Sequence, residues 1–127
     1  MALARHVQSR LKNEIVIWLV TAGLDRHPQA VPVWFLWDGR SFLIFAQHGA
    51  KVNHIRANPY VELHLNEIDD DIVRASGRAT ISTRPQAHTV PEYVRKYGSM
   101  IKGFGWTPDE FSRRYPNVIR VRRLKFH

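Results

Sequence analysis

The chain has 127 residues, 44% of them apolar, which is enough for one compact domain spanning 1–127. It contains no cysteine, which excludes disulfides, thiolate metal sites and a cysteine nucleophile. No segment approaches the roughly 20 apolar residues of a membrane span, and Met1–Arg10 lacks the apolar core of a signal peptide. We therefore expect a cytoplasmic protein with no membrane partner.

The formal net charge of +8 predicts an anionic partner. After Glu110 the chain carries six Lys or Arg residues and no acid. It shows no helix-turn-helix cue, no zinc-finger spacing and no ribonucleoprotein motif. A small, multiply charged molecule explains the charge as well as nucleic acid does, and we expect the small molecule, with no nucleic acid partner.

The first half of the chain predicts a helix and two strands. Residues 3–13 place Leu3, Val7 and Leu11 on one helical face, and residues 15–21 are apolar at every position, as in a strand covered on both faces. A second strand, 28–38, ends at the hairpin signal Asp38-Gly39. Full coverage of the first strand predicts packing against a partner subunit.

Pro32 falls in the middle of the second strand. A proline cannot donate to the hydrogen-bond ladder, so the strand should lie at an edge of the sheet or carry a bulge. A flat heterocycle lying across Val33, Trp34 and Phe35 could satisfy the unpaired backbone groups and stack on the aromatic rings. Ordinary packing of an edge strand is the alternative.

A strand-to-helix junction follows. Phe42–Ala46 predicts a buried strand, Gln47-His48-Gly49 ends it, and a helix is expected over 50–57. Lys51 then lies in the first helical turn, where the macrodipole disfavours a cation, so a bound anion such as a phosphate is expected there. A solvated surface lysine is the alternative reading, and the spacing does not match a nucleotide P-loop.

The remaining elements complete an antiparallel barrel. They are strands at 60–66 and 72–83, helices near 88–97 and 108–114, and a last strand at 117–126. Gly98, Gly103 and Gly105 are expected to loosen the link between the two helices, and a bulge is expected near Arg122-Arg123. The prediction is a mainly β fold with short helices and six antiparallel strands.

The run from Trp18 to Pro59, with Glu92-Tyr93 and the segment Trp106-Thr107-Pro108-Asp109-Glu110-Phe111, resembles a known family. It is similar to the flavin/deazaflavin oxidoreductases with the split β-barrel of pyridoxamine-phosphate oxidase, within the small branch of probable coenzyme F420-dependent enzymes. The resemblance implies an FMN-binding-protein-like split barrel that forms a homodimer.

The resemblance also implies a cofactor site. The cofactor phosphate would lie at Gln47, His48, Gly49, Ala50 and Lys51, with Arg56 nearby, and the ring system along Pro32, Val33, Trp34 and Phe35 at the dimer interface. Because Val31–Leu36 carries no charge, oxidation of a vitamin B6 phosphate is not expected.

The expected function is transfer of hydride from coenzyme F420 to a conjugated small organic acceptor. The basic composition suits the carboxylate tail of F420, and FMN is the alternative cofactor. A non-catalytic protein that binds flavin or haem is a further alternative. The histidines lack the spacing of a metal site, and no serine lies in a nucleophile elbow, so neither a metal nor a catalytic residue is predicted.

Overall fold

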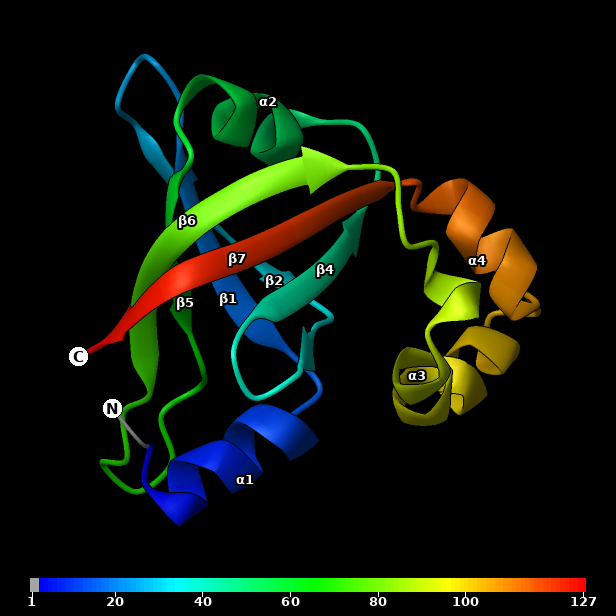
Figure 1. Cartoon of the computed structure of the whole chain (residues 1–127), viewed down its shortest axis with the longest axis horizontal. Coiled ribbons are helices and arrows are strands. Elements are labelled where there is room, and N and C mark those ends of the chain that lie inside the picture. Colours follow the sequence, from blue (N-terminus) through cyan, green and yellow to red (C-terminus); the bar gives the residue numbers. More distant parts are fainter. Residues whose placement is uncertain (1–2) are drawn as a thin grey trace.

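The computed structural model describes residues 3–127, which form an antiparallel sheet flanked by short helices (Figure 1). The strands are β1 (Ile17–Ala22), β2 (Pro28–Val33), β3 (Leu36–Trp37), β4 (Phe42–Ala46), β5 (Tyr60–His64), β6 (Arg74–Ser82) and β7 (Asn117–Phe126). The helices are α1 (Arg5–Asn13), α2 (Ala50–Ala57), α3 (Pro91–Gly103) and α4 (Pro108–Arg114), with one 3₁₀ turn, η1 (Ala87–Thr89). None of the helices between residues 3 and 127 is long and apolar enough to cross a membrane.

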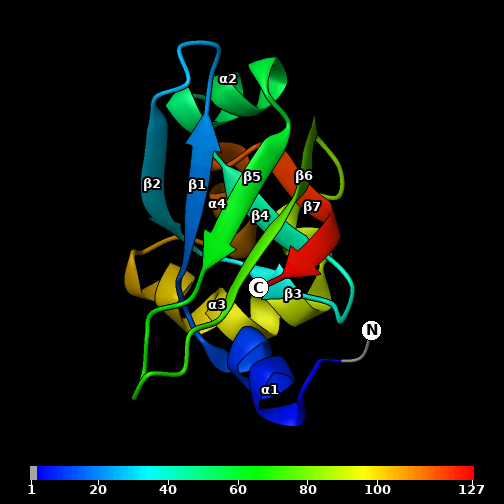
Figure 2. The same cartoon turned by 90° about the vertical axis from the view of Figure 1, so that its left-hand side faces the viewer.

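The sheet curls into a half-barrel with the strand order β2-β1-β5-β6-β7-β4-β3. Figure 2 shows β2, β1, β5, β6 and β7 side by side, with α2 at one end of the sheet and α1 at the other. The mainly β split-barrel fold expected from the sequence is therefore confirmed. The sheet has seven strands in place of the six expected, because the second predicted strand is divided.

The second predicted strand, 28–38, breaks at Trp34-Phe35. β2 forms one edge of the sheet by pairing with β1, and β3 forms the opposite edge by pairing with β4. The expectation that Pro32 lies in an edge strand is confirmed. The break arises because the backbone at Phe35 pairs with side chains of α3: its N–H donates to Tyr97 Oη at 2.9 Å, and its carbonyl accepts from Lys96 Nζ at 2.9 Å.

The bulge expected in the last strand is present. The β6–β7 register shifts between Ser76 and Arg78, and Arg123 adopts a positive φ of 53°. Gly77 lies at this point, where an added Cβ would come within 2.7 Å of Val121 Cγ1 and 2.9 Å of the Arg122 carbonyl oxygen. A glycine is thus needed for the close approach of the two strands.

The helix α3 differs from the sequence expectation. It begins at Pro91, is preceded by η1, and continues through Gly98 to Gly103. Its buried residues Tyr93, Tyr97 and Ile101 are spaced four apart, so a continuous apolar face outweighs the cost of about 1 kcal/mol for a glycine inside a helix.

Two groups of buried residues form the core. One fills the curl of the sheet and includes Leu19, Ile44 and Ile119, all of them fully buried. The other joins the outer side of β4 and β7 to α3 and α4, through Phe45, Val118 and the tyrosines of α3. Figure 1 shows α3 and α4 together beside the sheet, where this second group lies. The helical segment between β6 and β7 is thereby held against the end of β2.

Candidate functional site

A pocket of about 340 Å³ lies where the end of β2, the end of β4 and the start of α2 meet the helical segment. Its size is at the lower end of the range for small-molecule sites, about 300–1,000 Å³. The lining residues are Pro32, Val33, Trp34, Phe45, Ala46, Gln47, Lys51, Tyr93, Phe104, Trp106, Phe111 and Tyr115. We call this the aromatic pocket.

Five of the residues expected to bind a cofactor line the aromatic pocket. Pro32 and Val33 are the last two residues of β2 and Trp34 follows them, while Gln47 and Lys51 come from the β4–α2 junction. The curl of the sheet brings these two segments together although the β3–β4 hairpin separates them in sequence. The expected ring-binding strand and the expected phosphate-binding turn therefore share one pocket.

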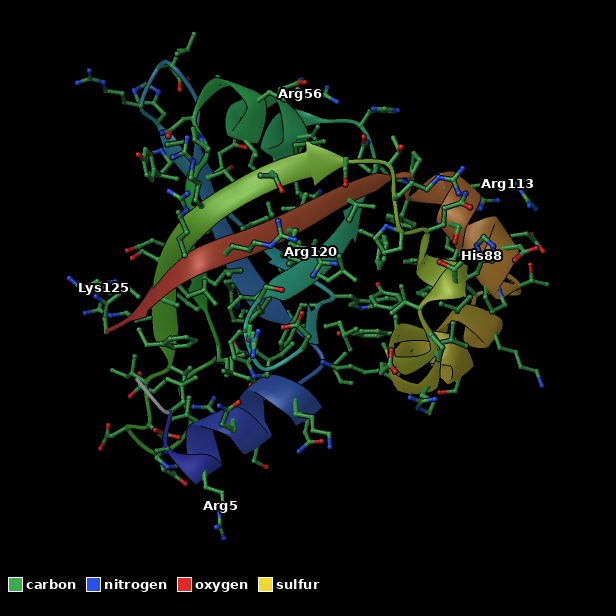
Figure 3. The ribbon with its side chains drawn as sticks, viewed as in Figure 1. Arg5, Arg56, His88, Arg113, Arg120 and Lys125 are labelled. Carbon is green, nitrogen blue, oxygen red and sulfur yellow. The ribbon has the colours of Figure 1, made fainter. Side chains whose placement is uncertain are left out.

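The other expected residues lie elsewhere. Phe35 is fully buried in the core inside the sheet. The His48 side chain is exposed and its Nδ1 lies 3.1 Å from Asn117 Nδ2. Gly49, Ala50 and Arg56 are exposed, and Figure 3 shows Arg56 on α2 at the top of the molecule. A role for these five residues in cofactor binding stays a prediction.

The start of α2 lacks the usual partners of a helix N-terminus. No side chain caps it, and its first turn carries no acidic residue. A Cβ built on Gly49 would meet no atom within 4 Å, so the space before the helix is open. Lys51, which is half-buried, adds a positive charge in this first turn. The N–H groups, the dipole and the ammonium together favour an anion.

Stacked aromatic rings form the opposite wall. The Trp34 indole stacks on Tyr97, with ring centroids 4.6 Å apart and an interplanar angle of 7°, and lies 5.7 Å from Phe111. Phe104 is 61% exposed at the mouth and lies 5.3 Å from Trp106. Such rings provide flat apolar surface for a planar ligand.

The sequence interpretation did not assign the wall residues contributed by the helical segment to the site. These residues are Tyr93, Phe104, Trp106, Phe111 and Tyr115. The many aromatic residues between 93 and 115 were the signal in the sequence that could have indicated this wall. Their contact with β2 depends on long-range packing that no local pattern encodes.

Tyr93 carries an unusual hydroxyl in this wall. The side chain is fully buried, and its Oη has no hydrogen-bond partner among residues 3–127. Burial, with smaller contributions from Tyr97 and Tyr115, raises the pKa of the Tyr93 phenol well above its ordinary value, so the group stays a neutral donor. A buried unpaired hydroxyl is uncommon and calls for an explanation such as an ordered water, an ion or a functional role.

A serine, a histidine and an aspartate also come together, in the helical segment where Figure 3 labels His88. His88 Nδ1 lies 2.9 Å from Ser112 Oγ, and His88 Nε2 lies 3.6 Å from Asp109 Oδ1. Ser112 is only 2% exposed, and its Oγ accepts the backbone N–H of His88 at 2.9 Å. A nucleophile needs access to substrate, so these contacts connect η1 to α4 structurally.

Comparison with solved structures finds the same fold in proteins of different function. A protein described as an F420 reductase has 21% sequence identity and a TM-score of 0.72 over 98% of both chains. An FAD-binding protein from Mesorhizobium loti has 21% identity and a TM-score of 0.66 over 98% of this chain and 92% of its own. A haem storage protein from Vibrio cholerae has 15% identity and a TM-score of 0.60, covering 96% and 90%. At these identities the likeness shows the fold.

Comparison with curated protein sequences finds no match. A family model described as pyridoxamine 5'-phosphate oxidase matches residues 3–124. The match covers every helix and all strands except the last two residues of β7. Together with the split-barrel architecture, it shows that this chain belongs to the pyridoxamine 5'-phosphate oxidase family.

Proposed function

We propose that this chain is an oxidoreductase that binds coenzyme F420 in the aromatic pocket and reduces a conjugated small organic acceptor. The proposal rests on the observation that Trp34 and Lys51 line the same pocket. Trp34 offers a stacking surface, and Lys51 offers a cation at an uncapped helix start. A ligand with both a flat ring and a phosphate would use both.

The residues of the pocket fit a tricyclic ring. The walls are mostly aromatic, and within the described chain the one buried side-chain polar atom without a hydrogen-bond partner is the Tyr93 hydroxyl. This hydroxyl is not exposed to the pocket, so donation to a heteroatom of a ring would require the wall to move. The volume of about 340 Å³ suits a ring system better than a whole nucleotide-like cofactor. The phosphate would then lie outside the rings, toward the start of α2.

Charge favours F420 over FMN. F420 carries a lactate and a polyglutamate tail beyond its phosphate, and this chain has a net charge of +8. Figure 3 shows Arg120 and Lys125 on β7 and Arg56 on α2, so cations are spread over more than one element. A long flexible anion can contact several of them, whereas the single phosphate of FMN cannot.

The protein's part in the reaction is binding and orientation. When bound, reduced F420 would supply a hydride, and the acceptor takes up one proton as well to complete a two-electron reduction. Trp34 and the aromatic rings of the helical segment would exclude water from the reacting face of the cofactor. Lys51 would bind the phosphate and so fix the position of the ring system in the pocket.

We propose further that the active form is a homodimer. The β1–β2 register pairs Trp18 with Pro32 and Val20 with Ala30, so these side chains share the outward face of the sheet. None of them is charged, and none is fully buried within one chain. Because Pro32 also lines the aromatic pocket, a subunit packed on this face would border the site.

Two alternatives remain distinct from this proposal. FMN has the same ring and phosphate groups and would use the same residues. A haem protein needs an axial ligand, and no histidine is among the residues lining the aromatic pocket. The pocket lining thus favours a flavin-type ring over haem.

The test is a set of dissociation constants for short-tailed F420, long-tailed F420 and FMN, each at low and high ionic strength. We expect affinity for F420 to rise with glutamate number and to fall with salt, because exposed charge pairs are screened beyond about 10 Å at 0.1 M salt. FMN should bind more weakly than F420 at both ionic strengths. Tighter binding of FMN at both ionic strengths would reassign the cofactor, and absence of binding by all three would remove the proposed function.

A further inference from the structure

A second hollow, of about 1020 Å³, lies between α1, the β3–β4 turn and α3. It shares no lining residue with the aromatic pocket. Figure 1 shows α1 at the bottom of the view and α3 at the right, the two helices that contribute most of the lining residues. We call it the α1–α3 groove.

The groove has an apolar floor. Ile15 is 39% exposed, Leu36 is half-buried, and Trp37 is 9% exposed. The indole is fixed in place, because its Nε1 donates to Gln8 Oε1 at 2.8 Å. This floor could cover the apolar body of a small molecule.

Lys96 is the most buried cation in the groove. Its Nζ donates to the Phe35 carbonyl at 2.9 Å, and it lies 3.9 Å from the Phe35 ring centroid and 5.3 Å from that of Tyr97. Within the described chain, no carboxylate forms an ion pair with this ammonium. The charge is therefore held against aromatic rings and one neutral carbonyl.

The acids near Lys96 have other partners. Glu92 pairs with Arg95 at 3.3 Å, Glu14 pairs with Arg10 at 2.5 Å, and Asp38 lies 3.6 Å from Arg120. The other cations of the groove, on the same helix and on α1, are Arg5, Lys12 and Arg95, all exposed. Burial lowers the pKa of Lys96 to about 8, and the charge of Glu14 opposes this only in part.

We propose that the α1–α3 groove is a second binding site, which takes a small organic acid with its carboxylate on Lys96 and its apolar body on Ile15, Leu36 and Trp37. A carboxylate would give the ammonium the counter-ion it lacks, in surroundings less polar than water, where a charge-assisted hydrogen bond is strong. Lys12 and Arg95 at the rim would attract the same anion. The inference does not depend on the nature of the cofactor.

The test is calorimetric titration of the purified chain with benzoate and with benzyl alcohol, an uncharged probe of similar shape. Benzoate should bind with at least about tenfold higher affinity than the alcohol, the factor that corresponds to one hydrogen bond to a charged group. Affinity for benzoate should be lower at pH 9.5 than at pH 6.5, because Lys96 loses its proton between them while benzoate stays ionised.

Three variants locate the binding site. Lys96→Met should weaken benzoate binding by about tenfold or more. In this variant Tyr97 Oη stays 3.1 Å from the Phe35 carbonyl, but its one proton is shared with the Ile15 carbonyl. Lys102→Met removes an exposed lysine from the same helix outside the groove and should change nothing. Lys51→Met tests whether the acid binds in the aromatic pocket.

Each contrary result is informative. Equal affinity for acid and alcohol, or unchanged binding by Lys96→Met, would overturn the proposal. Loss of binding by Lys51→Met in place of Lys96→Met would move the acid to the aromatic pocket and overturn it equally. If Lys96→Met does not fold, Lys96→Gln, which can still donate to the Phe35 carbonyl, replaces it and should show the same loss.

Discussion

Tyr97 holds the backbone of Phe35 at the place where the chain passes from one edge of the sheet to the other. Its Oη accepts the Phe35 N–H at 2.9 Å and donates to the Ile15 carbonyl at 2.6 Å. Its ring stacks on Trp34, which lines the aromatic pocket. One side chain of α3 therefore connects the closure of the half-barrel with the geometry of the site.

The variant Tyr97→Phe should lose both hydrogen bonds and keep the ring. We expect the free energy of unfolding, measured with urea, to fall by about 1–3 kcal/mol, because the Phe35 N–H is left buried and unpaired. Cofactor affinity should fall as well, since Trp34 loses its fixed position. Tyr60→Phe, at a tyrosine that is 65% exposed, is the control and should leave the unfolding free energy unchanged. Wild-type stability of Tyr97→Phe would contradict this role.

Replacing tyrosine by phenylalanine at Tyr93, one helical turn before Tyr97, should have a different effect on stability. Tyr93 Oη is buried without a partner in the described chain, and such a hydroxyl costs about 1–3 kcal/mol. We therefore expect Tyr93→Phe to be at least as stable as the wild type in urea and to bind cofactor more weakly. Unchanged cofactor affinity would mean that the ligand does not use this hydroxyl.

Lys51→Ala should weaken cofactor binding by about 1.5–3 kcal/mol, the range for hydrogen bonds to charged groups. Folding should be nearly unaffected, because Lys51 makes no ion pair within the described chain. Fluorescence titration measures the affinity, with the exposed Lys102→Ala as the control for loss of charge. An affinity equal to that of the wild type would remove Lys51 from the site.

The dimer proposal predicts a sedimenting mass of about twice that of the chain. Val20→Glu places a carboxylate on the outward face of β1, where burial against a partner without a counter-ion is costly. We expect it to sediment as a monomer with much weakened cofactor binding. Ser99→Glu adds the same charge to an exposed position of α3 and should stay dimeric. A wild-type monomer that binds cofactor at micromolar concentration would exclude a shared site.

Lys96 predicts a pH dependence of stability. Burial lowers its folded-state pKa from 10.5 to about 8, so between these values the unfolded chain binds more protons than the folded chain. Stability from this group therefore rises with pH in that window. Relative to Lys96→Met, the wild type should become more stable in urea at pH 9.5 than at pH 7. A constant difference would show that the ammonium is well solvated.

Local sequence patterns were sufficient to predict the structure wherever it depends on residues that are adjacent in the sequence. The helix at 50–57 was predicted with its observed ends because Gly49 and the Asn58-Pro59 step bound it. The strand expected over 72–83 contains β6, and the pair Arg122-Arg123 marked the bulge. The end of a strand and the start of a helix are short-range properties, so Lys51 could be recognised as an unusual cation from the sequence.

The break at Trp34-Phe35 and the aromatic wall depended on the tertiary structure. Val33–Leu36 is as apolar as a continuous strand, and only the hydroxyl of Tyr97 and the ammonium of Lys96, about 60 residues away in sequence, make the break favourable. The glycine at position 98 predicted that the helix ends there. The helix instead continues to Gly103, because this places Tyr97 and Ile101 in the core. The sequence by itself determined the strands, the α2 helix and the family pattern, because these follow from neighbouring residues. The shared pocket was decided only by long-range packing, which brings β2, α2 and the helical segment together.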